Sequence, residues 1–173
     1  MRPTADRVRE SLFARLGDLA GTRVLDLYAG SGALGIEALS RGAASALFVD
    51  RAEGCTRRLR RTLDELGLAG SARVWRAETG VALTRLARAG ERFDRVFLDP
   101  PYGEAELARA LAVLSASGIL HPDAVVVAEG GRRHPPGEVD GLVKQDERRH
   151  GDTIIARYTP VGAPAGTGGA EHP

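Results

Sequence analysis

Short apolar segments alternate with longer stretches of helical periodicity along most of this chain, and this alternation restricts the possible folds more than any other feature. Strands that alternate with helices build a parallel sheet that is wound in both directions and covered by helices on both faces. The sequence therefore predicts an α/β fold of the doubly wound, Rossmann-like type. The expected strands lie at residues 23–27, 46–49, 72–75, 95–98 and 124–127.

The segments between these strands repeat their apolar residues at helical spacing. Val8, Leu12 and Leu16 recur every four residues, and Thr4 ahead of them is a suitable N-cap. Near the other end of the chain, residues 141–148 and 153–158 have the pattern of a hairpin. Helices are expected at residues 4–16, from the glycine-rich turn to residue 41, over the segment before Gly67, at 81–89 and at 104–115.

The length of 173 residues suits one domain, and 43% apolar residues suffice for a core. We expect the domain over residues 1–160, with 1–20 as an N-terminal helix and connection. Residues 161–173, rich in glycine, proline and alanine, are expected to form a disordered tail. No apolar run is long enough to span a bilayer, and the N-terminus lacks the apolar region of a signal peptide. We therefore expect a cytoplasmic protein without membrane contact.

The counts of cysteine, histidine and charged residues limit the chemistry further. Cys55 is the single cysteine and cannot form an internal disulfide, and the four histidines show no paired spacing, so no metal site is expected. With 24 basic and 23 acidic residues the net charge is +1, and binding of nucleic acid must use local patches. Arginines at residues 57–61 and 132–133 could contact phosphate, although a solvated surface is the favoured explanation.

A glycine-rich turn follows the first expected strand and opens the next helix. It reads Gly30-Ser31-Gly32-Ala33-Leu34-Gly35, and glycines at this place let the backbone approach a ligand while helix N–H groups face it. Asp50 ends the next strand, where a carboxylate can accept both hydroxyl hydrogens of a ribose. Together the two features indicate a nucleoside-containing cofactor. The glycine motif by itself is also compatible with a tight turn.

Asp26 lies inside the end of the first expected strand, with Leu27, Tyr28 and Ala29 between it and Gly30. In dinucleotide enzymes the first glycine follows the strand almost at once, so this spacing disfavours a nicotinamide cofactor. A carboxylate at the lip of a buried strand suits an ammonium group, and S-adenosylmethionine carries such a group next to an adenosine. The same carboxylate could instead cap loop N–H groups, and the two roles are compatible.

The motif Asp99-Pro100-Pro101-Tyr102 follows the fourth expected strand and is the most specific feature of the chain. An exocyclic amine is a poor nucleophile because its lone pair is delocalised into the ring. If the Asp99 carboxylate and the Pro100 carbonyl each accept one N–H, the lone pair is aimed at an incoming methyl group. The prolines fix the backbone, and Tyr102 offers a ring on which an extruded base can stack. The alternative is a turn that simply ends a strand.

Three blocks of the sequence together resemble the RsmD-type methyltransferases. They are residues 2–13, which begin Arg-Pro-Thr-Ala-Asp-Arg, residues 25–43, which contain Asp-Leu-Tyr-Ala-Gly-Ser-Gly, and the Asp-Pro-Pro-Tyr motif. Residues 150–153, His-Gly-Asp-Thr, resemble the closing motif of the family, in which an aromatic residue commonly replaces the histidine. The family uses S-adenosylmethionine to methylate N2 of one guanine, position 966 of bacterial 16S ribosomal RNA. The resemblance covers residues 2–158.

The resemblance implies a class I methyltransferase fold, with a seven-stranded, mostly parallel sheet and a C-terminal antiparallel hairpin. It implies that Thr4 and Arg7 help to close the cofactor pocket or contact RNA phosphates, although a structural role for Arg7 is equally expected. It makes Asp99, Pro100, Pro101 and Tyr102 the catalytic residues. The implied cofactor-binding residues are Asp26, Tyr28, Ala29, Gly30, Ser31 and Gly32 around the methionine part, Asp50 on the ribose, and Arg51 and Glu78 near the adenine, where Glu78 could equally be an exposed helix cap.

These features predict an S-adenosylmethionine-dependent 16S rRNA guanine-N2 methyltransferase. Its expected partner is 16S rRNA in the small ribosomal subunit or an assembly intermediate, and it is expected to act as a monomer without a metal. Two alternatives stay open: methylation of N6 of a DNA adenine, because the same motif positions that amine, and a non-catalytic RNA-binding or assembly factor that keeps the fold. Relatives generally carry a basic, glycine-containing segment ahead of the Arg-Pro-Thr block. The sequence begins at Met1 without it, which leaves the affinity for RNA open.

Overall fold

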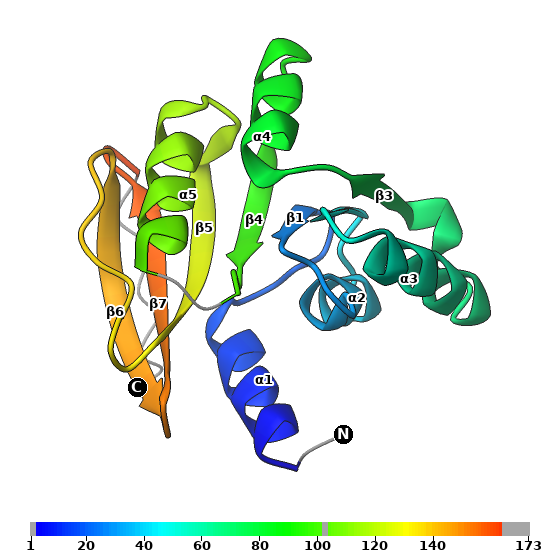
Figure 1. The fold of residues 1–173 in the computed structure, drawn as a ribbon, viewed down its shortest axis with the longest axis horizontal. Coiled ribbons are helices and arrows are strands. Elements are labelled where there is room, and N and C mark those ends of the chain that lie inside the picture. The colour runs from blue at the N-terminus through cyan, green and yellow to red at the C-terminus, as the bar shows by residue number, and fades with distance from the viewer. Residues whose placement is uncertain (1–2, 102–103, 164–173) are drawn as a thin grey trace, which may run out of the picture.

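A sheet of seven strands forms the centre of the protein (Figure 1). The computed structural model describes residues 3–101 and 104–163. In spatial order the strands are β3 (Ala72–Arg76), β2 (Ser45–Asp50), β1 (Arg23–Leu27), β4 (Phe93–Leu98), β5 (Leu120–Gly131), β7 (Thr153–Pro160) and β6 (Leu142–His150).

The strand directions give a parallel sheet with one reversed strand. Strands β1 to β5 run parallel to one another, and β7 pairs antiparallel with β5 on one side and with β6 on the other. The predicted doubly wound sheet with a terminal hairpin is therefore confirmed, and so is the seven-stranded architecture that the resemblance implies.

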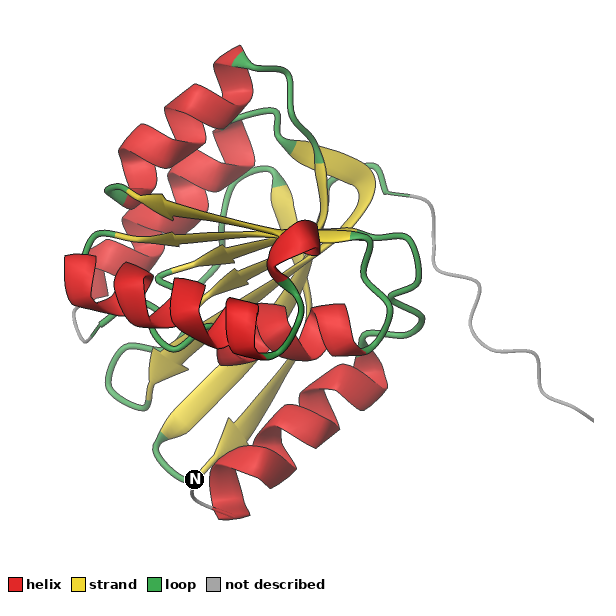
Figure 2. Ribbon diagram, turned by 90° about the vertical axis from the view of Figure 1, so that its right-hand side faces the viewer, coloured by secondary structure: helices red, strands yellow, loops and turns green. Residues whose placement is uncertain are grey.

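Helices cover both faces of this sheet, which Figure 2 shows nearly edge-on between them. A turn of 3-10 helix at Ala69–Ser71 leads into β3. On one face pack α4 (Thr79–Arg88) and α5 (Glu104–Ala116), and on the other pack α1 (Pro3–Arg15), α2 (Ala33–Ser40) and α3 (Glu53–Glu65).

The two helical layers enclose two apolar cores. Leu25 and Leu98 belong to the core under α4 and α5, whereas their neighbours Val24 and Phe97 belong to the core under α1 to α3. This follows from the alternation of side chains along a strand. Because the central strands are buried on both faces, they read as continuous apolar runs in the sequence. That is why the alternation of segments predicted the strands correctly.

Main-chain hydrogen bonds move several of the expected boundaries, and β5 and α4 are two examples. β5 extends from Leu120 to Gly131, well beyond the predicted residues 124–127. Its last residues, from Glu129 on, are held by pairing with β7 and carry no continuous apolar signal. Helix α4 begins at Thr79 rather than at residue 81, and Thr79 itself is buried. The pattern of apolar residues does not reveal these ends of β5 and α4, because main-chain hydrogen bonds determine them.

Charged groups fasten α1 to the terminal hairpin. Nη1 of Arg157 donates a hydrogen bond to the main-chain oxygen of Arg15 at 2.8 Å, and Nη1 of Arg15 donates to Oδ1 of Asp146 at 3.2 Å. Arg157 also donates to the carboxylate of Asp146. A carbonyl in the last turn of a helix has no partner within the helix, so the Arg157 contact satisfies an otherwise open group. The opening helix is thus held by residues far away in the sequence.

The end of the chain is described only in part. The N–H of Val161 donates to the oxygen of Gly141 at 2.9 Å. The rest of the predicted tail, from residue 164, lies outside the described residues, and so does Tyr102. Among the helices described, none combines the length and the apolar character needed to cross a membrane.

Replacement of Gly35 by alanine is expected to destabilise the fold. The added Cβ would lie 2.3 Å from Cε1 of Phe48, whose ring is fully buried. Overpacking of a buried site costs about 1–3 kcal/mol. Gly80→Ala in α4 is the matched control, because its added Cβ meets nothing within 4 Å, and it should leave stability unchanged or raise it by up to about 1 kcal/mol. Urea denaturation compares the two variants, and equal midpoints would contradict the packing argument.

Candidate functional site

A cavity of about 1500 Å³ opens where the parallel strands end. Its wall includes the turn after β1, the end of β2, the residues that follow β4, the end of β5 and the tip of the β6–β7 hairpin. In open α/β sheets, ligands bind at this edge, where the order of the strands reverses. Pockets for one small molecule usually measure about 300–1,000 Å³, so this cavity has room for a nucleoside cofactor and a second planar group.

Four carboxylates approach the cavity from one face of the sheet. Phe48 and Phe97 are the register partners of Asp26 in β2 and β4, and Val127 of β5 is the partner of Phe97. Residues two positions further along a strand point to the same face. The side chains that follow this row at the strand ends therefore share the face of Asp26, and they are Asp50, Asp99 and Glu129.

The glycine-rich turn has a backbone that glycine permits and most residues do not. Gly30 and Gly32 have φ values of 56° and 77°, in the left-handed region, and Tyr28 also lies there with φ 58°. A Cβ on Gly32 would lie 2.4 Å from Cδ1 of Leu59. The second glycine is thus required both by conformation and by the close approach of α3, and the turn can bend tightly over the strand ends.

Asp50 holds this turn to the end of β2. Its Oδ2 accepts a hydrogen bond from the N–H of Gly30 at 2.9 Å, and its Oδ1 accepts one from the N–H of Ala52 at 2.8 Å. A carboxylate oxygen has two lone pairs, so each oxygen can accept one further donor. The geometry is therefore compatible with the predicted contact to ribose hydroxyls. It adds a role that the sequence did not reveal, since the same carboxylate shapes the glycine turn.

Asp26 is a buried carboxyl group, 3% exposed, in contact with the first turn of α2. Its Oδ2 accepts a hydrogen bond from the N–H of Gly35 at 3.0 Å, which is the capping contact considered from the sequence. Burial is the main cause that raises the pKa of Asp26 to about 8, and the charges of Asp99 and Asp50 add to it. A cation in the cavity would stabilise the ionised form. These residues therefore fit a cofactor that carries an ammonium or sulfonium group.

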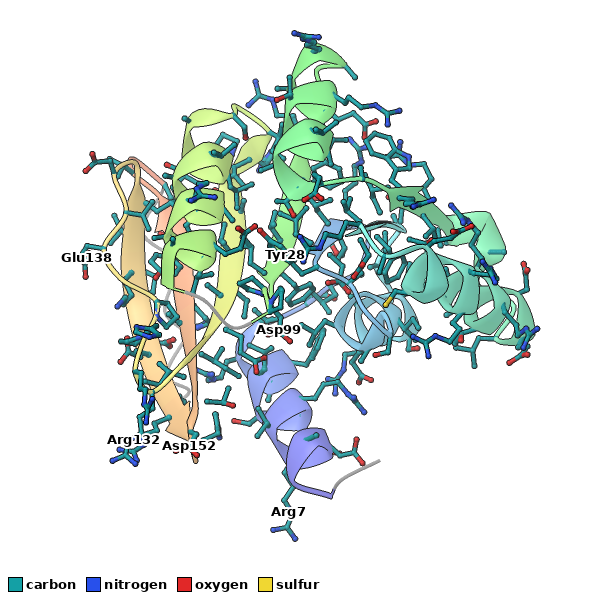
Figure 3. All side chains as sticks on the ribbon, in the orientation of Figure 1. Arg7, Tyr28, Asp99, Arg132, Glu138 and Asp152 are labelled. Atoms are coloured by element: carbon teal, nitrogen blue, oxygen red, sulfur yellow. The ribbon has the colours of Figure 1, made fainter. Side chains whose placement is uncertain are left out.

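Asp99 opens into the cavity from the end of β4, together with Pro100 and Pro101. Part of its surface stays exposed, while the protein around the rest desolvates the carboxyl and raises its pKa. Asp99 and Tyr28 both lie near the middle of the molecule in Figure 3. A raised pKa makes a carboxylate a better proton acceptor near neutral pH. The motif thus presents a basic oxygen to the cavity.

Two further acidic residues in the cavity were missed by the sequence analysis. The hydroxyl of Tyr28 donates a hydrogen bond to Oε1 of Glu106 in α5 at 2.6 Å, and burial with this contact raises the pKa of Tyr28 to about 12. Glu129 ends the apolar run of β5. Its position two residues after the strand predicted at 124–127 was the available signal. Glu106 gave no signal, because only tertiary packing brings its helix to Tyr28.

The structure brings most of the predicted site residues together. Gly32 is buried beneath the turn, outside the cavity wall. Arg7 is exposed on α1 and points away from Asp99 in Figure 3. Thr4 lies in the first turn of α1, and its side chain is outside the described part of the protein, as is all of Tyr102. In the wall are Asp26, Tyr28, Ala29, Gly30, Ser31, Asp50, Arg51, Glu78, Asp99, Pro100 and Pro101.

Several arginines in the 57–61 cluster have partners within the protein. Arg57 lies 3.4 Å from the carboxylate of Glu53, and Nη2 of Arg60 donates to the oxygen of Val74 at 3.0 Å. Arg132 lies at the cavity rim, and its Nη1 is 3.8 Å from Oδ1 of Asp152. Over the described ranges, no three histidine, cysteine, aspartate or glutamate side chains are grouped so as to hold a metal ion.

Comparison with known proteins identifies the family. The family described as "Conserved hypothetical protein 95" matches residues 1–159. The chain belongs to this family. Its relatives include YlbH of Bacillus subtilis (strain 168), whose name assigns it provisionally to the rRNA methyltransferases, at 40% identity over 93% of this chain and 89% of that protein. Ribosomal RNA small subunit methyltransferase D of Escherichia coli (strain K12) is 39% identical over 75% of this chain and 64% of that enzyme.

A solved structure agrees with this assignment. The yhhF protein of Escherichia coli, provisionally assigned to the methyltransferases, superimposes with a TM-score of 0.81 and 33% identity, over 92% of this chain and 88% of that one. The resemblance to RsmD-type methyltransferases, based on three sequence blocks, is thus confirmed for the family and for the fold.

Replacement of Asp26 by asparagine is expected to stabilise the cofactor-free protein in a pH-dependent way. The ordinary pKa of an aspartate, 3.8, is raised to about 8 in the folded protein. Between these values the folded state keeps a proton that the unfolded chain has released, so stability falls as pH rises. Asp26→Asn removes this loss, and its denaturation midpoint should exceed that of the wild type at pH 8 and converge with it near pH 4.

Asp64→Asn, on the exposed surface of α3, is the control for this measurement. It should show no such pH-dependent difference from the wild type. A constant gap between Asp26→Asn and the wild type from pH 4 to pH 8 would contradict the burial of an ionisable carboxyl at this position.

Proposed function

We propose that this protein is an S-adenosylmethionine-dependent methyltransferase that modifies the exocyclic N2 of a guanine in 16S rRNA, of the guanine 966 type. The observation that carries the proposal is that Asp99, Pro100 and Pro101 share one cavity with the glycine turn, Asp26 and Asp50. An amine-positioning motif beside a nucleoside-cofactor site is the arrangement that N-methylation requires. The names of the relatives support rRNA as the substrate.

The residues around the glycine turn would hold the cofactor. Asp26 would face its ammonium group, Asp50 its ribose hydroxyls, and Arg51 and Glu78 would lie near its adenine, since all four line the cavity. The first N–H groups of α2 also face this side and favour a negative group such as the cofactor's carboxylate. When bound, S-adenosylmethionine supplies a methyl group on a positively charged sulfur.

The motif after β4 would activate the amine. The Asp99 carboxylate and the Pro100 carbonyl each accept one N–H, which turns the nitrogen lone pair toward the methyl group. Transfer would form a new nitrogen–carbon bond, and the bond between that carbon and sulfur would break with its electron pair left on sulfur. The nitrogen then becomes acidic and loses one proton. Asp99 would accept that proton, and its raised pKa favours the transfer.

The proposal includes the partner and the place of action. The substrate is 16S rRNA in the small subunit or an assembly intermediate, which the protein meets in the cytoplasm as a monomer. A net charge of +1 gives little general attraction to RNA, so a structured ribonucleoprotein is the favoured form of the substrate.

Transfer of labelled methyl groups to unmodified small ribosomal subunits tests the function directly. We expect N2-methylguanosine as the product, identified by mass spectrometry, with weaker transfer to naked 16S rRNA and none to DNA. The reason is that, in this proposal, the motif after β4 holds the N2 amine of guanine and contacts with the particle supplement the weak binding of RNA. Methylated adenine in DNA, or cofactor binding without any transfer, would contradict the proposal.

Two alanine variants should separate catalysis from cofactor binding. Asp99→Ala is expected to lower kcat by about 100-fold or more, because a preorganised polar group at the reacting atom is lost, while cofactor affinity stays near the wild-type value. Asp50→Ala is expected to raise the Kd of the cofactor by about 10- to 100-fold, since it removes charge-assisted hydrogen bonds. Calorimetric binding and single-turnover transfer measure the two effects. Strong residual transfer by Asp99→Ala would exclude its proposed role.

A further inference from the structure

Glu129 stands beside Asp99 at the wall of the cavity. Leu98 and Ala128 are register partners in β4 and β5, and the next residue along each strand is Asp99 and Glu129 respectively. Neighbouring strands lie about 4.8 Å apart, so the two side chains leave the sheet on the same face as adjacent groups. Both line the cavity. A planar group held by Asp99 therefore presents its edge to Glu129 as well.

The backbone of Glu129 is fixed more firmly than that of a loop residue. It lies inside the ladder between β5 and β7, opposite Ile155. Only its side chain is free to meet a ligand. In the part of the chain that the structure describes, no hydrogen-bond donor reaches the carboxylate of Glu129. A half-buried acceptor without a donor is costly unless a ligand supplies one.

The electrostatic surroundings of Glu129 also favour a ligand that supplies a hydrogen-bond donor. Burial, with a smaller contribution from the charge of Asp99, raises its pKa to about 7. Donation of an N–H to a carboxylate favours its ionised form. An N–H on the bound substrate would therefore satisfy the group and keep it charged.

Guanine and adenine differ at the atom that would meet Glu129. In guanine the ring nitrogen N1, adjacent to the N2 amine, carries a hydrogen and is a donor. In adenine the ring nitrogen N1, adjacent to the N6 amine, is an acceptor, as it is in 2-aminopurine, which keeps the N2 amine of guanine. An ionised carboxylate can accept the N1–H of guanine. It repels the N1 lone pair of adenine and of 2-aminopurine.

We infer that Glu129 is the residue that selects guanine, by accepting the N1–H of the base whose N2 amine is held by Asp99 and Pro100. This inference rests on the proposed function and deepens it. It explains why a motif that could position several exocyclic amines would act on only one base. Glu129 contacts the substrate in this arrangement and takes no part in the proton transfer.

The inference is tested by changing the hydrogen-bonding group on the base and on residue 129. Small subunits are reconstituted with 16S rRNA that carries either guanine or 2-aminopurine at the methylated position. The wild type and Glu129→Gln are compared on both by kcat/KM. The glutamine amide can donate to N1 of 2-aminopurine, whereas the wild-type carboxylate cannot when ionised. The amide also keeps an acceptor oxygen for the N1–H of guanine, so the variant loses only the charge on this hydrogen bond. We expect the ratio of guanine to 2-aminopurine turnover to fall about 10-fold or more in the variant, mainly through gain on 2-aminopurine.

Glu138→Gln is the matched control, since Glu138 is exposed and points away from the cavity in Figure 3. It should keep the wild-type ratio. The ratio is taken within one protein, so a partly unfolded variant does not change it. The cofactor Kd of Glu129→Gln, measured by calorimetry, should stay within about twofold of the wild type.

The remaining outcomes each overturn the inference. An unchanged ratio with reduced turnover on both substrates would make Glu129 merely structural. A large rise in the cofactor Kd with an unchanged ratio would assign Glu129 to the cofactor. Absence of transfer by the wild type to guanine overturns the proposed function and this inference with it, whereas wild-type transfer with an unchanged ratio overturns the inference alone.

Discussion

The requirement that both faces of the central strands be buried determines most of this structure. Helices cover β1, β2, β4 and β5 on each side, so an unpaired polar side chain on these strands would lose its water without compensation. Polar chemistry is therefore confined to the strand ends, where the cavity lies. Because the strands are parallel, these ends meet at one edge of the sheet. The fold thus brings together carboxylates that are far apart in the sequence.

Asp26 is the exception, and its position illustrates the conflict between stability and binding. It lies one position before the end of β1, among apolar neighbours, and only the N–H of Gly35 donates to it among the contacts described. Burial opposes its charge. A residue that destabilises the empty fold at neutral pH becomes favourable when a cation occupies the cavity. The same reasoning applies, in weaker form, to Asp99 and Glu129, which are held close together with no donor of their own in the described structure.

In the proposed function, the part of the cavity assigned to the substrate includes elements beyond those assigned to the cofactor. Glu129 lies near the end of β5, and Arg132 and Asp152 come from the rim beyond it, where the main-chain N–H of Arg132 donates to the main-chain oxygen of Asp152. This pairing holds the hairpin tip against the end of β5. The reversed strand β7 therefore does more than close the sheet. Its pairing with β5 continues past Ala128 and includes Glu129, which therefore lies beside Asp99.

The sequence by itself determined the order and type of the elements, because each central strand is a short apolar run and the turns carry glycine. It also indicated Asp26, Asp50 and Asp99, since each stands at the end of such a run. Tertiary structure alone decided that Asp50 holds Gly30, that Tyr28 meets Glu106 and that Arg157 caps α1. Those contacts join residues that are far apart in the sequence, and no repeating pattern of side chains links them. Strand pairing set the length of β5 and brought Glu129 beside Asp99, because the pairing of main chains depends on the neighbouring strand and is not encoded in the pattern of apolar side chains.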